Sequence, residues 1–305
     1  MRTRPVAVLF AAALLLAPSA FAQKKPRIKI LATGGTIAGA ALKPTDPGYK
    51  SGAVGVDVLI AAVPQLKDIA EVSGEQIASI GSQDMNDEIW LKLAKRVNEL
   101  LASSDVDGIA ITHGTDTLEE TPYFLHLVTK SDKPVVLTGS MRPSTAMSAD
   151  GPLNIYNAVA VAADPEAKGR GVLVLIDDDI HSAHDVVKRH TTDVATFTSG
   201  EAGLVGVALF GDNIWYRTPV QVHTTKSDLS IAADQTTLPR VDIIYAHANM
   251  SPDLITAAAR NGAKGIVVAG VGDGNMTAPA FDELTRGAAQ GVGAGRSSRT
   301  NGGRH

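Results

Sequence analysis

The sequence predicts an α/β protein whose larger, N-terminal part is a doubly wound, mostly parallel sheet. Apolar strand patterns alternate with amphipathic helix patterns along most of the chain, which is the order that right-handed crossovers between parallel strands require. Three of the strand patterns end in polar turns that contain glycine, after Ala32, Ile80 and Ile111. The length of 305 residues leaves room for a second, smaller α/β domain.

The composition is typical of a folded globular protein, with 44% hydrophobic and 20% charged residues. Such a chain is neither disordered nor a membrane bundle. The sequence contains no cysteine, so its fold depends on an apolar core and on any subunit contacts rather than on disulfides.

The first 22 residues have the three parts of a secretory signal peptide. Arg2 and Arg4 precede an apolar run at 6–16, which is too short to span a bilayer, and small residues follow at 20–22. We expect cleavage before Gln23 rather than a retained anchor, which places the mature protein in the periplasm or outside the cell. Loss of the leader changes the net charge from −4 to −6, so the electrostatics of the mature chain do not favour binding to nucleic acid. The sequence after the leader has no second long apolar segment that would suggest a membrane contact.

The expected elements follow a regular order. In a catalytic domain covering 23–215, strands are expected at 28–32, 69–80, 108–112, 135–138 and 172–176, with helices at 56–62, 86–101, 118–128 and 154–163. This order predicts a flavodoxin-like sheet. A domain covering 240–305 is expected to contain strands at 241–246 and 265–269 and helices at 252–261 and 279–289.

Two segments lack a sustained apolar pattern. The segment 216–239 contains two prolines, several threonines and charges, and it is predicted to be a linker between the domains. The end of the chain, 291–305, is poor in apolar side chains, so we do not expect it to form a central strand. The C-terminal α/β domain is therefore predicted to be incomplete.

The segment 27–39 is the most informative part of the sequence. An apolar strand leads directly into Gly34 and Gly35, whose missing Cβ atoms allow the backbone to approach a ligand closely. Ligands of open α/β sheets bind at the carboxyl ends of the strands, and Thr36 stands at that position. Thr36 is therefore the leading candidate for a nucleophile, although a threonine hydroxyl needs a base and an orienting partner.

The segment 40–55 is rich in proline and glycine and contains one aromatic residue, Tyr49. This composition is typical of loops. Active-site lids have it, and so do ordinary surface loops. Its place directly after the Thr36 turn favours a lid.

A parallel sheet brings the polar turns to one edge, where hydroxyls, an amide and a carboxylate suit a small ligand with an amino group and a carboxylate. The side chains expected there are Thr36, Ser82, Gln83, Thr115 and Asp116. Lys188 follows an acidic strand end, and a lysine buried beside a carboxylate and a threonine can act as a base. Thr115, Lys188 and Asp116 thus form a second candidate set of nucleophile, base and orienting group.

Simpler interpretations account for some of these residues. Thr117 and Glu120 have the spacing of a helix capping box, and Asp84 and Asn86 can cap the helix that follows them. Lys188 can be an ordinary solvated lysine. Each polar turn can therefore serve to begin a helix rather than to bind a ligand.

Other kinds of site have weaker support. His181 and His184 lack further ligands at metal spacing, and the acids at 177–179 fit a solvated strand end better than a Mg²⁺ site. We therefore predict no metal. A glycine pattern at 270–274 follows a strand, which suits a dinucleotide-binding turn, but the spacing is a weak match.

Four segments taken together resemble the bacterial type II, periplasmic L-asparaginases and their glutaminase-asparaginase relatives. They are TGGTIA at 33–38, GSQD at 81–84, THGTDT at 112–117 and TDVATF at 192–197. The similarity extends from about residue 27 to residue 290. It implies hydrolysis of L-asparagine to L-aspartate and ammonia through an acyl-enzyme on threonine, without a metal or organic cofactor. It also implies a homotetramer with active sites between intimate pairs of subunits.

The resemblance implies roles for the matched residues. Thr36 resembles the nucleophile of the family and Tyr49 its partner in the lid. Thr115, Asp116 and Lys188 resemble the second catalytic set, in agreement with the grouping inferred above.

The same resemblance implies a substrate site. Ser82, Gln83, Thr115 and Asp116 would hold the α-carboxylate and α-amino groups, and Asn275 resembles a residue that the neighbouring subunit contributes. Asp273 stands where dual-specificity relatives tend to carry aspartate, which implies some activity on L-glutamine.

The end of the sequence departs from the family. Gly293-Ala294-Gly295 replaces an apolar strand, and the final strands, helix and pocket glutamate of the family have no counterpart before His305. We therefore expect a C-terminally truncated or altered member whose Tyr49 lacks its acidic partner. The alternative is a non-catalytic periplasmic protein that binds an amino acid between two α/β lobes.

Overall fold

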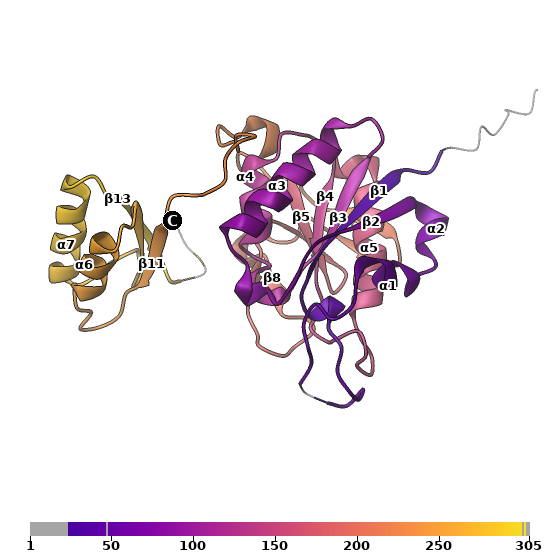
Figure 1. The fold of residues 1–305 in the computed structure, drawn as a ribbon, viewed down its shortest axis with the longest axis horizontal. Coiled ribbons are helices and arrows are strands. Elements are labelled where there is room, and N and C mark those ends of the chain that lie inside the picture. The colour runs from indigo at the N-terminus through magenta and orange to yellow at the C-terminus, as the bar shows by residue number, and fades with distance from the viewer. Residues whose placement is uncertain (1–23, 47, 301, 303–305) are drawn as a thin grey trace, which may run out of the picture.

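The computed structural model describes residues 24–46, 48–300 and 302 (Figure 1). The predicted signal peptide, 1–22, lies outside these residues. Within the described part of the chain, no helix is both long enough and apolar enough to cross a membrane. Figure 1 shows a large α/β body joined by an extended segment to a smaller one.

An eight-stranded sheet forms the centre of the large body, in the order β10-β9-β6-β5-β4-β3-β1-β2. Five neighbouring strands are parallel: β2 (Glu71–Ile80), β1 (Arg27–Gly34), β3 (Gly108–Thr112), β4 (Val135–Thr138) and β5 (Val172–Ile176). The sheet continues antiparallel through β6 (Asp179–Ser182), β9 (Gly206–Leu209) and β10 (Asp212–Trp215). The predicted doubly wound, mostly parallel sheet is confirmed, and the antiparallel extension is an addition to it.

The sheet changes direction at the acidic residues that follow β5. Asp177 and Asp178 have φ values of 51° and 66°, so both adopt the left-handed conformation that a two-residue hairpin turn needs. The side chain of Asn157 donates a hydrogen bond of 2.8 Å to Asp178. These acids were expected to be a solvated strand end, and they instead form the turn between β5 and β6.

Helices cover both faces of the sheet, and the strand residues alternate between the two cores. Ile28 and Ile30 of β1 pack with the face covered by α1 (Val56–Ala61), α2 (Leu66–Ile69) and α5 (Gly151–Ala163). Leu31 packs with the opposite face, under α3 (Asp87–Ala102) and α4 (Thr121–Val128). This alternation is the period-two pattern of a strand buried on both sides.

Short 3-10 turns and one small ribbon complete the large body. The turns are η1 (Thr36–Ala38), η2 (Ser82–Asp84), η3 (Thr115–Thr117), η4 (Pro165–Ala167), η5 (Gly200–Ala202) and η6 (Thr224–Lys226). The ribbon consists of β7 (Val187–Lys188) and β8 (Phe197–Thr198), which pair only with each other.

The two proposed helix caps have different outcomes. Asn86 caps α3, because its side-chain oxygen accepts a hydrogen bond of 3.1 Å from the Ile89 backbone N–H. The capping box of Thr117 and Glu120 is wrong. The Thr117 hydroxyl donates instead to the Ser82 carbonyl at 2.9 Å, and α4 begins at Thr121 without a side-chain cap.

The smaller body contains a three-stranded parallel sheet in the order β11-β12-β13. Its strands are β11 (Val241–Tyr245), β12 (Gly265–Gly270) and β13 (Gly293–Ser298), and its helices are α6 (Asp253–Arg260) and α7 (Ala278–Ala289). The sequence at 291–305 was expected to be too poor in apolar residues for a central strand. It supplies β13 at an edge of this sheet, where backbone pairing with β12 holds it and few side chains need burial.

Part of the predicted linker packs against the large body. His223 and Thr224 are buried, and Lys130 after α4 donates a hydrogen bond of 2.6 Å to the Ser227 carbonyl. Lys95 of α3 donates hydrogen bonds to the carbonyl groups of Ala233 and Gln235. Two lysines thus fix much of the 216–239 segment by its backbone.

Candidate active site

The turns after β1 and β3 meet at two glycines. Gly35 has a φ of 79°, and a Cβ built on it would lie 2.3 Å from the Gly114 Cα, closer than any side chain can approach. This contact places the first residues of η1 and η3, Thr36 and Thr115, at the same carboxyl edge of the sheet. Both threonines are buried, with exposed fractions of 7% and 5%.

Tyr49 contacts the first threonine. The hydroxyl oxygens of Thr36 and Tyr49 lie 2.7 Å apart, and either group can donate. The loop that carries Tyr49 is held near the site, because Ala40 and Lys50 pair through both of their backbone hydrogen bonds and the Gly52 N–H donates to the Gly35 carbonyl. The structure therefore places the predicted lid against the Thr36 turn.

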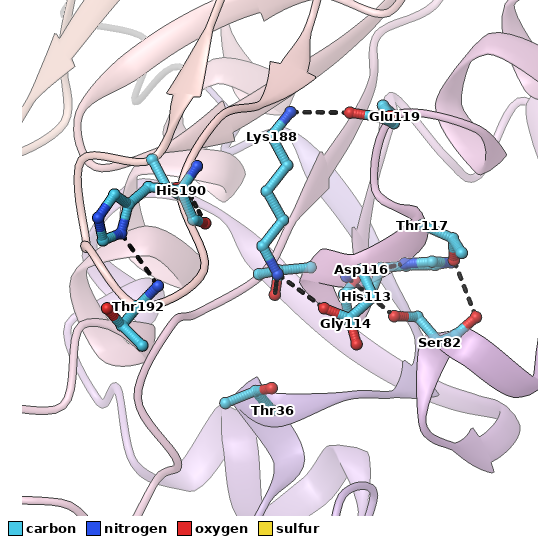
Figure 2. Close-up of polar contacts among 12 residues, drawn as sticks. Thr36, Ser82, His113, Gly114, Asp116, Thr117, Glu119, Lys188, His190 and Thr192 are labelled. Carbon is cyan, nitrogen blue, oxygen red and sulfur yellow. Dashed lines mark hydrogen bonds and ion pairs between the residues drawn. The ribbon is translucent and has the colours of Figure 1, made fainter. Parts of the chain in front are cut away.

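Lys188 contacts the second threonine. Its ammonium donates a hydrogen bond of 2.9 Å to the Thr115 hydroxyl. It also donates one of 2.7 Å to the Asp116 carboxylate (Figure 2). The lysine side chain is only 17% exposed, whereas that of Asp116 is 62% exposed. The three residues that the sequence grouped as a second set are thus in direct contact.

The turn after β2 lies beside the turn after β3. The Ser82 hydroxyl accepts a hydrogen bond of 3.1 Å from the Asp116 N–H, so it fixes the backbone of the second set (Figure 2). Gln83 is exposed, and its amide donates to the Asp84 carboxylate at 3.3 Å. Ser82 and Asp116 therefore lie side by side, and the Gln83 side chain stays accessible from the same turn.

Asn275 is not brought to these residues. It belongs to the smaller body, where its backbone N–H and C=O pair with Val271. Its side chain is exposed, as is that of Asp273. Within the described residues no hydrogen bond joins Asn275 to the two threonine sets.

His113 directly follows β3 and was not predicted from the sequence to belong to the site. Its ring is fully buried and forms a directed chain of hydrogen bonds, in which the Trp90 indole donates to Thr121, Thr121 donates to His113 and His113 donates to the Gly114 carbonyl. Burial lowers the pKa of His113 to about 4, so the ring is neutral near pH 7. Its position at a strand end, two residues before Thr115, was a usable signal.

Glu119 and His190 also fix the backbone around the site, and no pattern in the sequence indicated that they would. The Glu119 carboxylate accepts a hydrogen bond of 2.7 Å from the Lys188 backbone N–H. The imidazole Nδ1 of His190 accepts a hydrogen bond of 3.1 Å from the Thr192 N–H (Figure 2). It also accepts one of 2.9 Å from the Asp193 N–H, and the two bonds close the turn between β7 and β8.

The acidic turn after β5 lies at the same edge of the sheet but is separate from these contacts. Burial, followed by the charges of Asp177 and Asp178, raises the pKa of Asp179 to about 6. The pKa of Asp177 is raised by burial and then by neighbouring acids that include Asp193. Among the residues that the structure describes, no group of three or more His, Asp or Glu side chains is arranged to hold a metal ion.

Comparisons with known proteins agree with this architecture. The family model described as "Asparaginase, N-terminal" matches 27–221, and the model described as "Glutaminase/Asparaginase C-terminal domain" matches 240–305. The crystal structure of the probable cytoplasmic L-asparaginase from Campylobacter jejuni superposes with a TM-score of 0.88 at 49% identity, over 90% of this chain and 84% of that one.

Curated relatives show the same similarity over most of their length. L-asparaginase 2 of Bacillus subtilis is 55% identical over 280 residues, which are 91% of this chain and 74% of that protein. The glutaminase-asparaginase of Pseudomonas fluorescens biotype A is 48% identical over 92% of this chain and 77% of that protein. With both family models matched and the two threonine turns in contact, the chain belongs to the asparaginase family.

Proposed function

We propose that this protein is an amidohydrolase that converts L-asparagine and water to L-aspartate and ammonia through an acyl-enzyme on Thr36. The observation that carries the proposal is the contact of two turns at one sheet edge, each carrying a buried threonine whose hydroxyl has its own polar partner. The names of relatives that are 48–55% identical support the same reaction.

The residues provide for both halves of the reaction. In the first, the Thr36 Oγ attacks the amide carbon, its proton passes to a neighbouring acceptor, and ammonia leaves with a proton as the ester forms. Tyr49 is the group in contact with that hydroxyl. In the second, water attacks the ester and restores the threonine.

Thr115 and Lys188 form the proton relay of the proposed mechanism. In its neutral form Lys188 accepts the Thr115 proton along the 2.9 Å contact, and Asp116 stabilises the ammonium that results. Backbone N–H groups in the glycine-containing turns can stabilise the oxyanion. The proposed chemistry requires no metal or organic cofactor.

Substrate binding is assigned to the adjacent turns. Ser82, Gln83, Thr115 and Asp116 would hold the α-carboxylate and α-amino groups. Asn275 would reach the pocket of a neighbouring subunit in a homotetramer, because within its own chain it lies apart from the threonine turns. Activity on L-glutamine belongs to the same proposal, since some relatives are named glutaminase-asparaginases.

Export belongs to the proposal as well. The leader at 1–22 supports a periplasmic or secreted enzyme. A non-catalytic amino-acid-binding protein is not favoured, because the relatives that match most of this chain are named as enzymes.

The decisive experiment measures ammonia released from L-asparagine by the purified full chain and by Thr36→Ala. We expect turnover by the wild type and a kcat at least about 10⁴-fold lower in the variant, because the attacking oxygen is gone. Thr237→Ala, which changes an exposed threonine of the linker segment, is the matched control and should retain full activity.

Activity that survives Thr36→Ala would remove Thr36 as the nucleophile. A folded wild type that binds L-asparagine in calorimetry without releasing ammonia would support the binding protein instead. The Thr36 variant should melt at the same temperature as the wild type, which separates loss of chemistry from loss of fold.

A further inference from the structure

Lys188 lies on a ribbon that has little stability of its own. β7 and β8 are two residues each and pair only with each other, outside the eight-stranded sheet. Isolated two-stranded ribbons are marginal in water, so contacts with the rest of the protein must determine where this one lies. Any residue that fixes the ribbon also fixes the reach of Lys188.

The backbone N–H of Lys188 points away from the partner strand. Successive N–H groups along a strand alternate in direction, and that of Arg189 donates to the Thr196 carbonyl across the ribbon. The N–H of Lys188 donates instead to the Glu119 carboxylate, at 2.7 Å. Glu119 thus occupies the free edge of β7.

One short segment consequently holds Lys188 at both ends. Thr115 and Asp116 accept hydrogen bonds from its ammonium, and Glu119, three residues after Asp116, accepts from its backbone N–H. Figure 2 shows the lysine side chain extended between these two contacts. The distance between Lys188 and Thr115 is therefore set by a single piece of backbone rather than by two independent elements.

We propose that Glu119 is a positioning residue, which keeps Lys188 within proton-transfer distance of Thr115 by binding its backbone N–H. The inference rests on the proposed function, in which Lys188 is the base for Thr115. Lysine has a flexible four-carbon stem, so its backbone must be fixed before its amine can be placed accurately. A misplacement of about 1 Å can cost roughly 10²-fold in rate.

The test compares Glu119→Ala, Glu119→Gln and Glu119→Asp, with Glu120→Ala as the control that removes the adjacent carboxylate. We expect Glu119→Ala to lower kcat about 10- to 100-fold, with KM changed less than about twofold, because the base rather than the substrate is displaced. Glu119→Gln keeps an oxygen acceptor at the same reach and should recover most of the rate. The aspartate of Glu119→Asp is too short to reach the backbone N–H, so this variant should not recover the rate. The kcat of Glu120→Ala should equal that of the wild type.

Amide hydrogen exchange gives a second readout that does not depend on turnover. The segment 187–189 should exchange at least about tenfold faster in Glu119→Ala than in the wild type, and Glu119→Gln should restore its protection. Equal kcat and equal exchange in Glu119→Ala would overturn the proposal. The proposal would also be overturned if Glu119→Gln lost as much kcat as Glu119→Ala, and this comparison holds even if Glu119→Ala folds poorly.

Different results would contradict the proposed amidase function and the positioning role of Glu119. A wild type without amidase activity would contradict the proposed function, while exchange at 187–189 would still report whether Glu119 holds Lys188. An active wild type whose kcat and exchange are indifferent to Glu119 would contradict the positioning role alone.

Discussion

Tyr49 and Thr36 form a close polar contact at the proposed nucleophile. Their oxygens are 2.7 Å apart, and Thr36 is buried whereas Tyr49 is 39% exposed. A threonine hydroxyl is weakly acidic, so a hydrogen-bonding partner is needed both to orient it and to share its proton. In the proposed mechanism Tyr49 has this role, because its hydroxyl is in contact with that of Thr36.

Tyr49→Phe should lower kcat for ammonia release about 10²-fold or more, because it removes the proton-sharing group and keeps the ring. KM and the melting temperature should change little. Tyr216→Phe alters an exposed tyrosine of the linker segment and serves as the control. An unchanged kcat in Tyr49→Phe would show that the contact has no part in the chemistry.

At the scale of residues, the sequence predicts those positions that follow from sheet geometry. Thr36 follows β1 and Thr115 and Asp116 follow β3, so all three lie at one edge of the sheet as expected, because the carboxyl ends of parallel strands meet there. Glu119 and His190 could not be found in this way. Their roles depend on the position of the β7–β8 ribbon, which no periodic pattern encodes.

The loop that carries Tyr49 depends on one backbone conformation. Gly52 has a φ of 63°, and a Cβ built on it would lie 2.9 Å from the backbone carbon of Ser79. Its N–H also donates to the Gly35 carbonyl, which ties the loop to the Thr36 turn. A side chain at position 52 would therefore push the loop away from Thr36.

Gly52→Ala should reduce kcat about tenfold or more, since a strained left-handed residue costs about 1–3 kcal/mol unless the loop moves. Gly48→Ala is the matched control in the same loop, because a Cβ there meets no atom within 4 Å. Steady-state kinetics of both variants are sufficient. Equal kcat values for the two would contradict the role assigned to Gly52.

At the scale of elements, the parallel strands and their helices could be read from apolar patterns, and the β5–β6 turn and the edge strand β13 could not. The β5–β6 turn consists of acidic residues in left-handed conformations, so its sequence resembles a solvated strand end. β13 is held by backbone pairing with β12 rather than by apolar side chains. Edges have fewer burial requirements, and their sequences therefore carry less of the pattern.

At the scale of the whole molecule, four histidines are buried among the residues that the structure describes, His113, His126, His181 and His223, and burial lowers the pKa of each below its ordinary value. Burial lowers the pKa values of His113, His126 and His181 to about 4, against an ordinary value of 6.5. Between these two values the unfolded chain binds more protons than the folded one, so stability falls as the pH falls. Asp179 has the opposite effect. Its pKa is raised in the folded state, so the folded protein binds a proton there more readily than the unfolded chain, and stability rises as the pH falls.

We expect the free energy of unfolding to decrease between pH 7 and pH 5. Each of the three histidines whose pKa is lowered to about 4 contributes a loss of about 2 kcal/mol over this range, which exceeds the gain from the partly exposed Asp179. Urea unfolding followed by circular dichroism at the two pH values would measure it. A midpoint that is equal or higher at pH 5 would show that these rings are not neutral in the folded protein.

The small size of the β7–β8 ribbon has a consequence for heating. Regions with few buried contacts open before the core does, and this ribbon has two residues per strand, whereas β1, β3, β4 and β5 are almost fully buried. We therefore expect Lys188 to separate from Thr115 at temperatures that leave the large sheet intact. Thermal inactivation should then precede melting, and substitutions that strengthen the sheet core should raise the melting temperature without prolonging activity.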